Sequence, residues 1–162
     1  MQLRLATAAD AEDLRRIYNH EVENTTATFD IEPRSLRDQR QWITERQGAL
    51  GVVVAEFEGR VVGFASLSPY RNRAGYRTTV ENSVYVSEDV RGLGVGRALM
   101  DELIDMAVRR GFHSMVAHIV DGHEASMALH RACGFEVVGT EREVGRKFGA
   151  WLDAVIMQRM LA

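Results

Sequence analysis

The first third of the chain changes from an alternating to a helical pattern of apolar residues. Polar and apolar side chains alternate over Gln2–Ala6, which predicts a short strand. Thr7 and Asp10 have the spacing of a capping box and predict the start of a helix. The apolar residues of this helix recur at helical spacing and are Ala11, Leu14, Ile17, Tyr18 and Val22. A polar, irregular segment over Glu23–Arg34 separates this helix from a second one, expected over residues 35–47.

The middle of the chain has the pattern of a β-hairpin followed by a further strand. Gly51–Phe57 and Val61–Ser68 are rich in apolar and β-branched residues. Because Glu58–Gly59 between them suits a tight turn, the two runs are expected to pair. Tyr70–Arg77 is expected to be a loop. Val, Thr and Tyr are frequent in Thr78–Val86, which predicts another strand.

The second half alternates helical and strand patterns after a glycine-rich turn at Arg91–Gly96. Apolar residues share one helical face from Val95 to Arg110. The remaining expected elements are a strand at Ser114–Val120, a helix at Glu124–Ala132, and strands at Phe135–Thr140 and Trp151–Met160. The resulting order, β-α-α-β-β-β-α-β-α-β-β, predicts an α/β fold with a mixed sheet, because hairpins and helical crossovers both occur.

The length and composition are those of one globular domain. The chain has 162 residues, of which 46% are hydrophobic and 27% charged, so we expect a single domain over residues 1–162. The net charge of -3 argues against a nucleic-acid or anionic-membrane partner. All 20 basic residues except Lys147 are Arg, a bias that GC-rich codon usage would produce.

The cysteine and histidine content excludes several classes of site. A single cysteine, Cys133, cannot form an intramolecular disulfide or a multi-cysteine zinc site, and we expect it to be a buried, small apolar residue. The five histidines show no metal-like pairing on one helix, so no metal is expected. The N-terminus lacks the pattern of a secretory signal, and no apolar stretch approaches the length of a membrane span. We therefore expect a cytoplasmic protein.

Three glycines, Gly92, Gly94 and Gly96, mark the turn from a strand into a helix, and Arg91 and Arg97 flank them. Glycine allows positive φ and a close approach of the backbone to a ligand. The free N–H groups at the start of a helix can hold phosphate oxygens, and the two Arg side chains add cationic donors. The spacing fits neither a Walker P-loop nor a dinucleotide fingerprint. The alternative is an ordinary glycine-rich turn.

The turn and several other segments carry a resemblance to a known family. Arg91–Gly96 resembles the (Q/R)-x-x-G-x-(G/A) signature of the GNAT superfamily of N-acetyltransferases, and Glu124–Phe135 resembles its second cofactor motif. Tyr18–His20, Tyr76–Val86 and Val144–Asp153 are similar to the narrower phosphinothricin acetyltransferase group. That group includes enzymes that acetylate methionine sulfoximine and methionine sulfone. The resemblance extends over nearly the whole chain and implies a GNAT-like mixed sheet flanked by about four helices.

The resemblance also implies acetyl-CoA as the co-substrate, without a metal. It would lie along Val84–Val86 and at the turn Arg91–Arg97, and would be contacted from the next helix. The residues implied in binding are Val84, Tyr85, Val86, Arg91, Gly92, Leu93, Gly94, Val95, Gly96, Arg97, His123 and Ser126. His123 stands where the superfamily commonly has Asn, so its contact would differ in geometry.

Acetyl transfer from a thioester to an amine requires that the amine lose a proton and that the leaving thiolate be stabilised. By resemblance, Glu81 is the expected base; a solvated or Arg-paired carboxylate is the alternative. His130 stands where many superfamily members have a Tyr near the cofactor sulfur. We expect His130 or Tyr85 to assist the leaving sulfur; the alternative for His130 is a packed helix residue bonded to the backbone.

The substrate is expected to lie near the loop that precedes Glu81. This loop contains three Arg and no acidic residue, which suits a carboxylate or another polar head group, although solvated charges are the alternative. Phe29 resembles an aromatic pocket wall of the group, and Lys147 is a weaker candidate for substrate binding or an interface. The full set is Phe29, Arg71, Arg73, Ala74, Gly75, Tyr76, Arg77, Glu81 and Lys147.

Together these features predict an acetyl-CoA-dependent N-acetyltransferase that acts by direct attack. The expected acceptor is the α-amine of a methionine sulfoximine, methionine sulfone or phosphinothricin-like compound. The resemblance also implies a homodimer. The alternatives are another small amine or a protein N-terminus as acceptor, and a non-catalytic acyl-CoA sensor.

Overall fold

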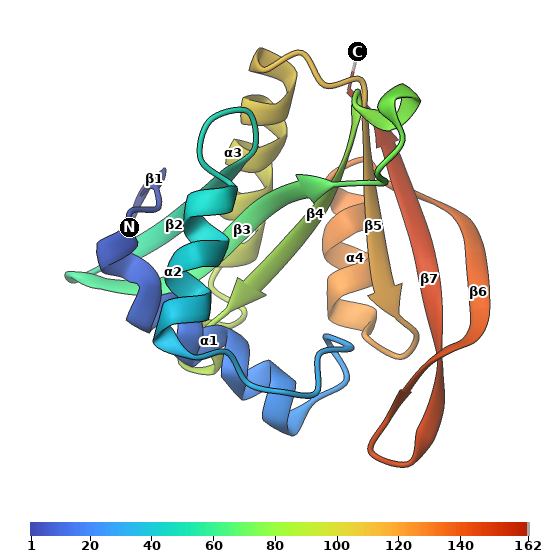
Figure 1. Cartoon of the computed structure of the whole chain (residues 1–162), viewed down its shortest axis with the longest axis horizontal. Coiled ribbons are helices and arrows are strands. Elements are labelled where there is room, and N and C mark those ends of the chain that lie inside the picture. The colour runs from blue at the N-terminus through green and yellow to red at the C-terminus, as the bar shows by residue number, and fades with distance from the viewer. Residues whose placement is uncertain (162) are drawn as a thin grey trace.

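A computed structural model describes residues 1–161 of the chain (Figure 1). Seven strands form one sheet in the order β1-β2-β3-β4-β5-β7-β6. The strands are β1 (Gln2–Leu5), β2 (Gly51–Phe57), β3 (Arg60–Pro69), β4 (Thr79–Val86), β5 (Ser114–Val120), β6 (Glu136–Lys147) and β7 (Ala150–Met160). The α-helices are α1 (Ala11–Asn24), α2 (Leu36–Glu45), α3 (Val95–Arg109) and α4 (Glu124–Ala132). The predicted element order and the mixed sheet are confirmed.

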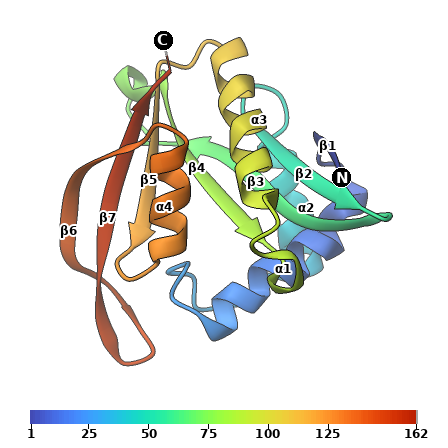
Figure 2. The same ribbon diagram turned by 180° about the vertical axis from the view of Figure 1, so that it is seen from behind.

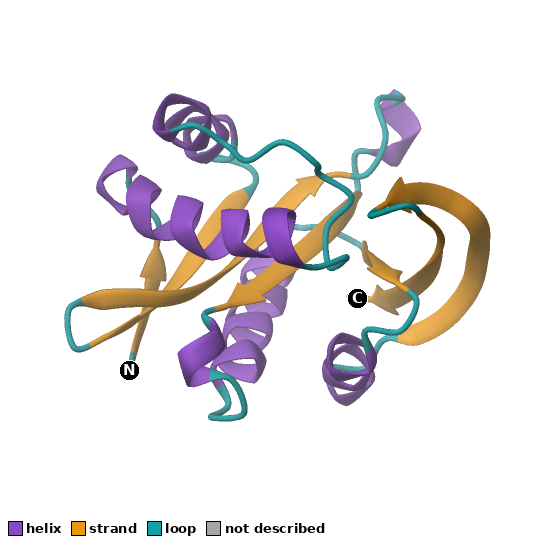
Figure 3. Ribbon diagram, turned by 90° about the horizontal axis from the view of Figure 1, so that it is seen from below, coloured by secondary structure: helices purple, strands orange, loops and turns teal. Residues whose placement is uncertain are grey.

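The helices cover both faces of the sheet. Helices α1 and α2 lie on one face, and α3 and α4 lie on the other (Figures 2 and 3). Successive side chains of a strand point to opposite faces, so an inner strand must be apolar throughout. In β2, Val52 and Val54 pack in the cluster under α1 and α2, whereas Val53 and Ala55 pack in the cluster under α3. This two-sided burial explains the uninterrupted apolar run that the sequence shows there.

The largest difference from the predicted boundaries concerns β6. The strand expected at Phe135–Thr140 runs from Glu136 to Lys147 in the structure, as an edge strand whose residues are mostly exposed on both faces. Such a strand has no buried face and therefore no apolar alternation to reveal its length. The loop Tyr70–Arg77 contains a short 3-10 turn at Ala74–Tyr76. At the start of the first helix, the Thr7 N–H donates to the Asp10 carboxylate at 2.8 Å, as the capping-box spacing suggests.

The feature that positions the site is a fork between β4 and β5, the parallel pair of the sheet. Their ladder has three residue pairs and ends at Glu81 opposite Val116. Beyond it, β4 stays paired with β3 as far as Val86, and β5 stays paired with β7 as far as Val120. The two strands therefore diverge, as Figure 1 shows, and we call the opening the β4–β5 fork.

No helix among residues 1–161 has both the length and the apolar character needed to cross a membrane.

Candidate active site

The β4–β5 fork contains a cavity of about 500 Å³. Its walls come from the diverging parts of β4 and β5, from the start of α4, and from Glu21 and Ala27 near the end of α1. Because β4 has lost its partner on this side, the backbone groups of its second half are free to hydrogen-bond a ligand. Side chains of β4 alternate between two sides of the fork, which we call the α4 side and the α1 side.

The glycine turn lies at the end of β4 and leads into α3. Gly94 is the N-cap of α3 and has a φ of +85°, in the left-handed region that favours glycine. An added Cβ at Gly92 or Gly94 would meet no atom within 4 Å, so the turn faces open space. A Cβ on Gly96 would lie 3.3 Å from Leu129 of α4, which shows how closely the two helices approach. The first N–H groups of α3 point toward this turn without partners inside the helix, as an anion site requires.

The two arginines of the turn have different surroundings. Arg91 lines the cavity, forms an ion pair with Glu21 of α1, and donates from Nε to the Val86 carbonyl at 3.3 Å. Arg97 instead pairs with Asp101 one turn along α3, at 2.9 Å. The structure therefore brings Arg91 to the cavity, whereas Arg97 lies outside it. Leu93 is an exposed residue of the turn.

His130 lies on the α4 side of the fork and is only 2% exposed. Its Nδ1 lies 2.7 Å from the Ser126 carbonyl, which can only accept, so Nδ1 carries the proton. Its Nε2 then accepts from the Asn82 side-chain amide at 2.9 Å. Burial lowers the pKa of His130, which keeps the ring neutral.

This arrangement limits what His130 can do. Neither ring nitrogen has a free N–H to offer the cavity, so donation to a leaving sulfur would first require protonation of Nε2, which burial opposes. In the structure, His130 is a packed helix residue bonded to the backbone, which is the alternative given for it in the sequence analysis. Asn82 lines the cavity, and its Oδ1 atom is buried and has no hydrogen-bond partner among the described residues.

Glu81 lies on the opposite, α1 side of the fork, at the last pair of the β4–β5 ladder. His118 of β5 contacts it, with Nδ1 2.8 Å from Glu81 Oε1. The other ring nitrogen of His118 lies 3.7 Å from Glu141 of β6. Glu81 and His118 are both about a third exposed, at 31% and 29%, and His118 lines the cavity. The predicted base is therefore paired with a histidine and is open to solvent.

Tyr85 is on the same side of β4 as Glu81 and also lines the cavity. Its ring packs between Tyr18 of α1, at 5.2 Å, and Phe64 of β3, at 5.5 Å. Burial raises the pKa of Tyr85 well above its usual range, so the hydroxyl keeps its proton. It can donate a hydrogen bond but is a poor source of a proton.

His123 and Ser126 both line the cavity from the start of α4. The His123 Nε2 atom is hydrogen-bonded to the Thr26 hydroxyl at 2.8 Å, which ties α4 to the loop after α1. Val84 and Val86 line the cavity from β4. These positions agree with those that the resemblance implies for the cofactor.

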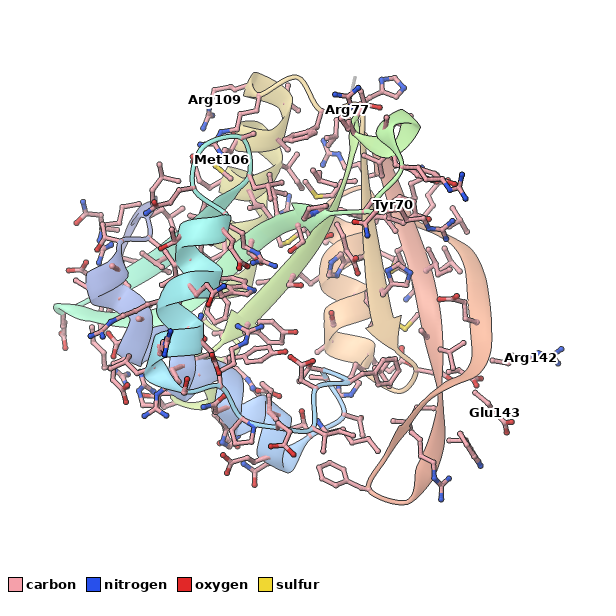
Figure 4. The ribbon with its side chains drawn as sticks, in the orientation of Figure 1. Tyr70, Arg77, Met106, Arg109, Arg142 and Glu143 are labelled. Carbon is pink, nitrogen blue, oxygen red and sulfur yellow. The ribbon has the colours of Figure 1, made fainter. Side chains whose placement is uncertain are left out.

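The residues predicted to bind the substrate do not line this cavity. Arg71 stacks on Tyr70 and Tyr76, at 4.7 and 5.5 Å, and Arg77 Nε donates to the Ala74 carbonyl. Figure 4 shows Tyr70 and Arg77 at the closed end of the fork, away from its opening. Arg73, Ala74 and Gly75 belong to the same exposed loop.

Phe29 and Lys147 lie where the hairpin of β6 and β7 meets the loop after α1. The Phe29 ring covers Gly145, where any Cβ would collide with it. Lys147 is 4% exposed, and its amine donates to the Thr28 carbonyl at 2.9 Å. Burial lowers the pKa of Lys147. Its amine thus holds the hairpin against the loop and does not line the cavity.

Sequence reasoning missed four polar residues of the site. They are Glu21, Asn82, His118 and Thr26, the partners of Arg91, His130, Glu81 and His123. One of them had a visible signal: His118 interrupts an otherwise apolar run in its strand. Among residues 1–161, no three His, Cys, Asp or Glu side chains come together in the manner of a metal site.

Comparisons with known proteins place this geometry in context. The model of the acetyltransferase (GNAT) family matches residues 14–135. The L-methionine sulfoximine/L-methionine sulfone acetyltransferase of Pseudomonas aeruginosa is 44% identical over 158 residues, covering 96% of this chain and 92% of that protein.

Two crystal structures share the fold over almost the whole chain. A phosphinothricin acetyltransferase from Sinorhizobium meliloti, in complex with acetyl-CoA, is 42% identical with a TM-score of 0.96, covering 99% of this chain and 88% of that one. A ribosomal-protein-alanine N-acetyltransferase from Brucella melitensis is 46% identical with a TM-score of 0.97, covering 99% of both chains.

Proposed function

The chain belongs to the GNAT family of N-acetyltransferases, and from that premise we propose that it transfers the acetyl group of acetyl-CoA to a small amino-acid analogue. The proposed acceptor is the α-amine of methionine sulfoximine, methionine sulfone or phosphinothricin. The relatives named above support this choice, since two of them carry these substrates in their names. We treat residues 1–162 as one such domain acting in the cytoplasm.

The observation that carries the proposal is the β4–β5 fork, which opens beside the glycine turn. The turn at Gly92–Gly96 and Arg91 would hold the pyrophosphate, through backbone N–H groups and a guanidinium. The free backbone edge of Val84–Val86 would hydrogen-bond the amide-containing arm. When bound, acetyl-CoA supplies a thioester whose carbonyl carbon is electrophilic.

In the proposed mechanism, Glu81 accepts the proton that the acceptor amine must lose before it can attack. An α-amine is mostly protonated near neutral pH, so a carboxylate at the fork raises the fraction that can react. The new N–C bond then forms as the C–S bond breaks. Tyr85, on the same side of the fork as Glu81, donates a hydrogen bond toward the leaving sulfur. His130 remains neutral and holds Asn82 in place.

A second acceptor class is favoured by one observation. The Brucella melitensis structure, at 46% identity, is named for acetylation of a ribosomal protein's alanine, which is also an α-amine. The chemistry at Glu81 would be the same, and the two acceptors differ in how much room the site must leave for the rest of the polypeptide.

A thiol-release assay with acetyl-CoA tests the proposal. The acceptors are methionine sulfoximine, methionine sulfone, phosphinothricin, and an alanine-terminated peptide of ribosomal-protein sequence. We expect turnover with at least one of the three small compounds at a kcat/KM at least about a hundredfold above that for the peptide. Preference for the peptide would establish the second acceptor class. Binding of acetyl-CoA without turnover on any amine would indicate a sensor.

We also propose that the protein is a homodimer. Support comes from β6, an edge strand that leaves Val137, Val138 and Val144 exposed, and from Phe148 and Trp151 of the same hairpin. Exposed apolar groups of this number are typical of interaction surfaces. Light scattering after gel filtration should give about twice the mass of one chain, and a monomer at micromolar concentration would refute the dimer.

A further inference from the structure

Beyond the end of the backbone ladder, the side chains of Glu81 and His118 make the first contact across the β4–β5 fork. Glu81 faces Val116 in the last ladder pair, and His118 follows two residues further along β5, on the same side of the sheet. The imidazole reaches back to the carboxylate with 2.8 Å between Nδ1 and Oε1. Glu141 of β6 stands at the other end of the ring, 3.7 Å from Nε2. Three titratable groups from three strands thus form a line from the fork toward solvent.

The contacts among Glu81, His118 and Glu141 contribute little to the stability of the fold. All three side chains are partly exposed, and Glu141 is 47% exposed. Ion pairs in such surroundings contribute about 0–1 kcal/mol, because water screens them and holding the side chains costs entropy. The line is instead placed where the proposed reaction releases a proton.

We propose that His118 is a positioning and proton-relay residue for Glu81, a role that rests on the proposed function. In the resting enzyme, the ring donates from Nδ1 to Glu81 and so orients the carboxylate. In the relay step, the ring first exchanges protons with water, losing the proton on Nδ1 and gaining one on Nε2. Glu81, which has taken one proton from the acceptor ammonium, then passes that proton to Nδ1. The cation that forms lies between two carboxylates, and its Nε2 proton leaves to water.

The surrounding charges favour this transient cation. The carboxylates within ion-pair distance of His118 are Glu81 on β4 and Glu141 on β6. The residue opposite on β7 is Ile156, which is uncharged.

Three variants separate positioning from relay. His118→Ala removes both the hydrogen bond to Glu81 and the titratable ring. His118→Gln keeps a side-chain N–H donor but cannot carry the proton. His20→Ala is the matched control, because His20 also stands beside a glutamate, 3.4 Å from Glu88, but outside the fork.

We expect His118→Ala to lower kcat at neutral pH about tenfold or more, while KM for acetyl-CoA stays within about twofold. His118→Gln should also lower kcat, because its amide cannot carry the proton. Imidazole in the buffer should restore part of the kcat of His118→Ala and leave His20→Ala unchanged.

Two kinetic results would overturn the proposal. One is a His118→Ala enzyme whose kcat stays within about twofold of the wild-type value. The other is a loss of kcat that follows a loss of melting temperature and that imidazole does not restore.

A measurement that does not depend on turnover can test the pairing of His118 with Glu81 separately from the proposed function. The ring-nitrogen NMR shifts of His118 should change in Glu81→Gln and stay unchanged in Glu88→Gln. Unchanged shifts in both variants overturn the proposal. Changed shifts in Glu81→Gln, in a protein that acetylates none of the acceptors, support the pairing and refute only the proposed acceptor.

Discussion

The two sides of the β4–β5 fork each present an imidazole bonded to a side chain of β4, and the two rings have opposite properties. His130 on the α4 side is buried, and its partners are an amide and a backbone carbonyl. His118 on the α1 side is partly exposed and stands between two carboxylates. One side is therefore fixed in a neutral state, whereas the other is suited to exchange protons with water.

Strand geometry produces this difference from two neighbouring residues. Glu81 and Asn82 are consecutive in β4, so their side chains point to opposite faces of the sheet. Asn82 meets the packed interface with α3 and α4, where Met100 also contacts its amide. Glu81 meets the open face near the edge of α1. A single strand thus supplies a buried polar group to one side and the proposed reactive group to the other.

Replacing the reactive group should have the largest effect. Glu81→Gln keeps the size and shape of the side chain but removes its ability to accept a proton, so we expect kcat near neutral pH to fall about 100-fold or more. The loss should shrink at higher pH, where more of the acceptor amine is already unprotonated. The assay is thiol release as a function of pH. Glu143→Gln is the control, because Glu143 projects from the hairpin far from the fork (Figure 4). Full turnover by Glu81→Gln across the pH range would remove its role as base.

Removing the histidine on the α4 side should lower the free energy of unfolding more than removing the histidine on the α1 side. His130→Ala deletes a buried ring and removes the nitrogen acceptor of the Asn82 amide, so we expect a loss of about 2–4 kcal/mol in the free energy of unfolding. His118→Ala removes a partly exposed ion pair and should cost less than about 1 kcal/mol. Urea unfolding of both variants measures the contrast. Equal losses would mean that the two sides do not differ as described.

The fold was easier to predict from the sequence than the contacts on the two sides of the fork. Local patterns predicted the helices and inner strands well, because burial of a helix face or of a whole strand leaves a periodic signature in residues such as Leu14 and Val54. Family resemblance named Glu81 and His130 as candidates for the chemistry. The partners His118 and Asn82 could not be assigned, because the register between β4 and β5 and the packing of α4 join segments distant in sequence. The exposed strand β6 lacked any burial signature.

The buried histidine on the α4 side should also make the free energy of unfolding depend on pH. Burial lowers the pKa of His130 in the folded protein, so below the unfolded value of about 6.5 the unfolded chain binds a proton that the folded protein does not. Stability should therefore fall as the pH is lowered from about 7 to about 5, by at most about 1.4 kcal/mol per pH unit for this one proton.

His130→Gln is the variant that isolates this contribution. Its free energy of unfolding should be lower than that of the wild-type protein at pH 7, and the difference should narrow as the pH falls. The pKa of Asp10 is lowered by Arg4 and that of Asp89 lies at about 2, so both carboxyls stay ionised in this window in the folded protein. Parallel curves for the two proteins would show that His130 binds its proton equally in the folded and unfolded states.

The smallest effect is expected at Tyr85, which lies on the reactive side but is packed like a core residue. Tyr85→Phe keeps the ring between Tyr18 and Phe64 and removes only the hydroxyl, so the free energy of unfolding should change by less than about 1 kcal/mol. Because burial raises the pKa of Tyr85, its hydroxyl can donate a hydrogen bond to the leaving sulfur but yields its proton poorly. We therefore expect kcat to fall less than about tenfold, far less than in Glu81→Gln. Thiol release and urea unfolding, measured on the same preparation, check both values. A loss of kcat as large as that of Glu81→Gln would make Tyr85 a true proton donor and would extend the reactive character of the α1 side from the closed end of the fork, at Glu81, toward its opening.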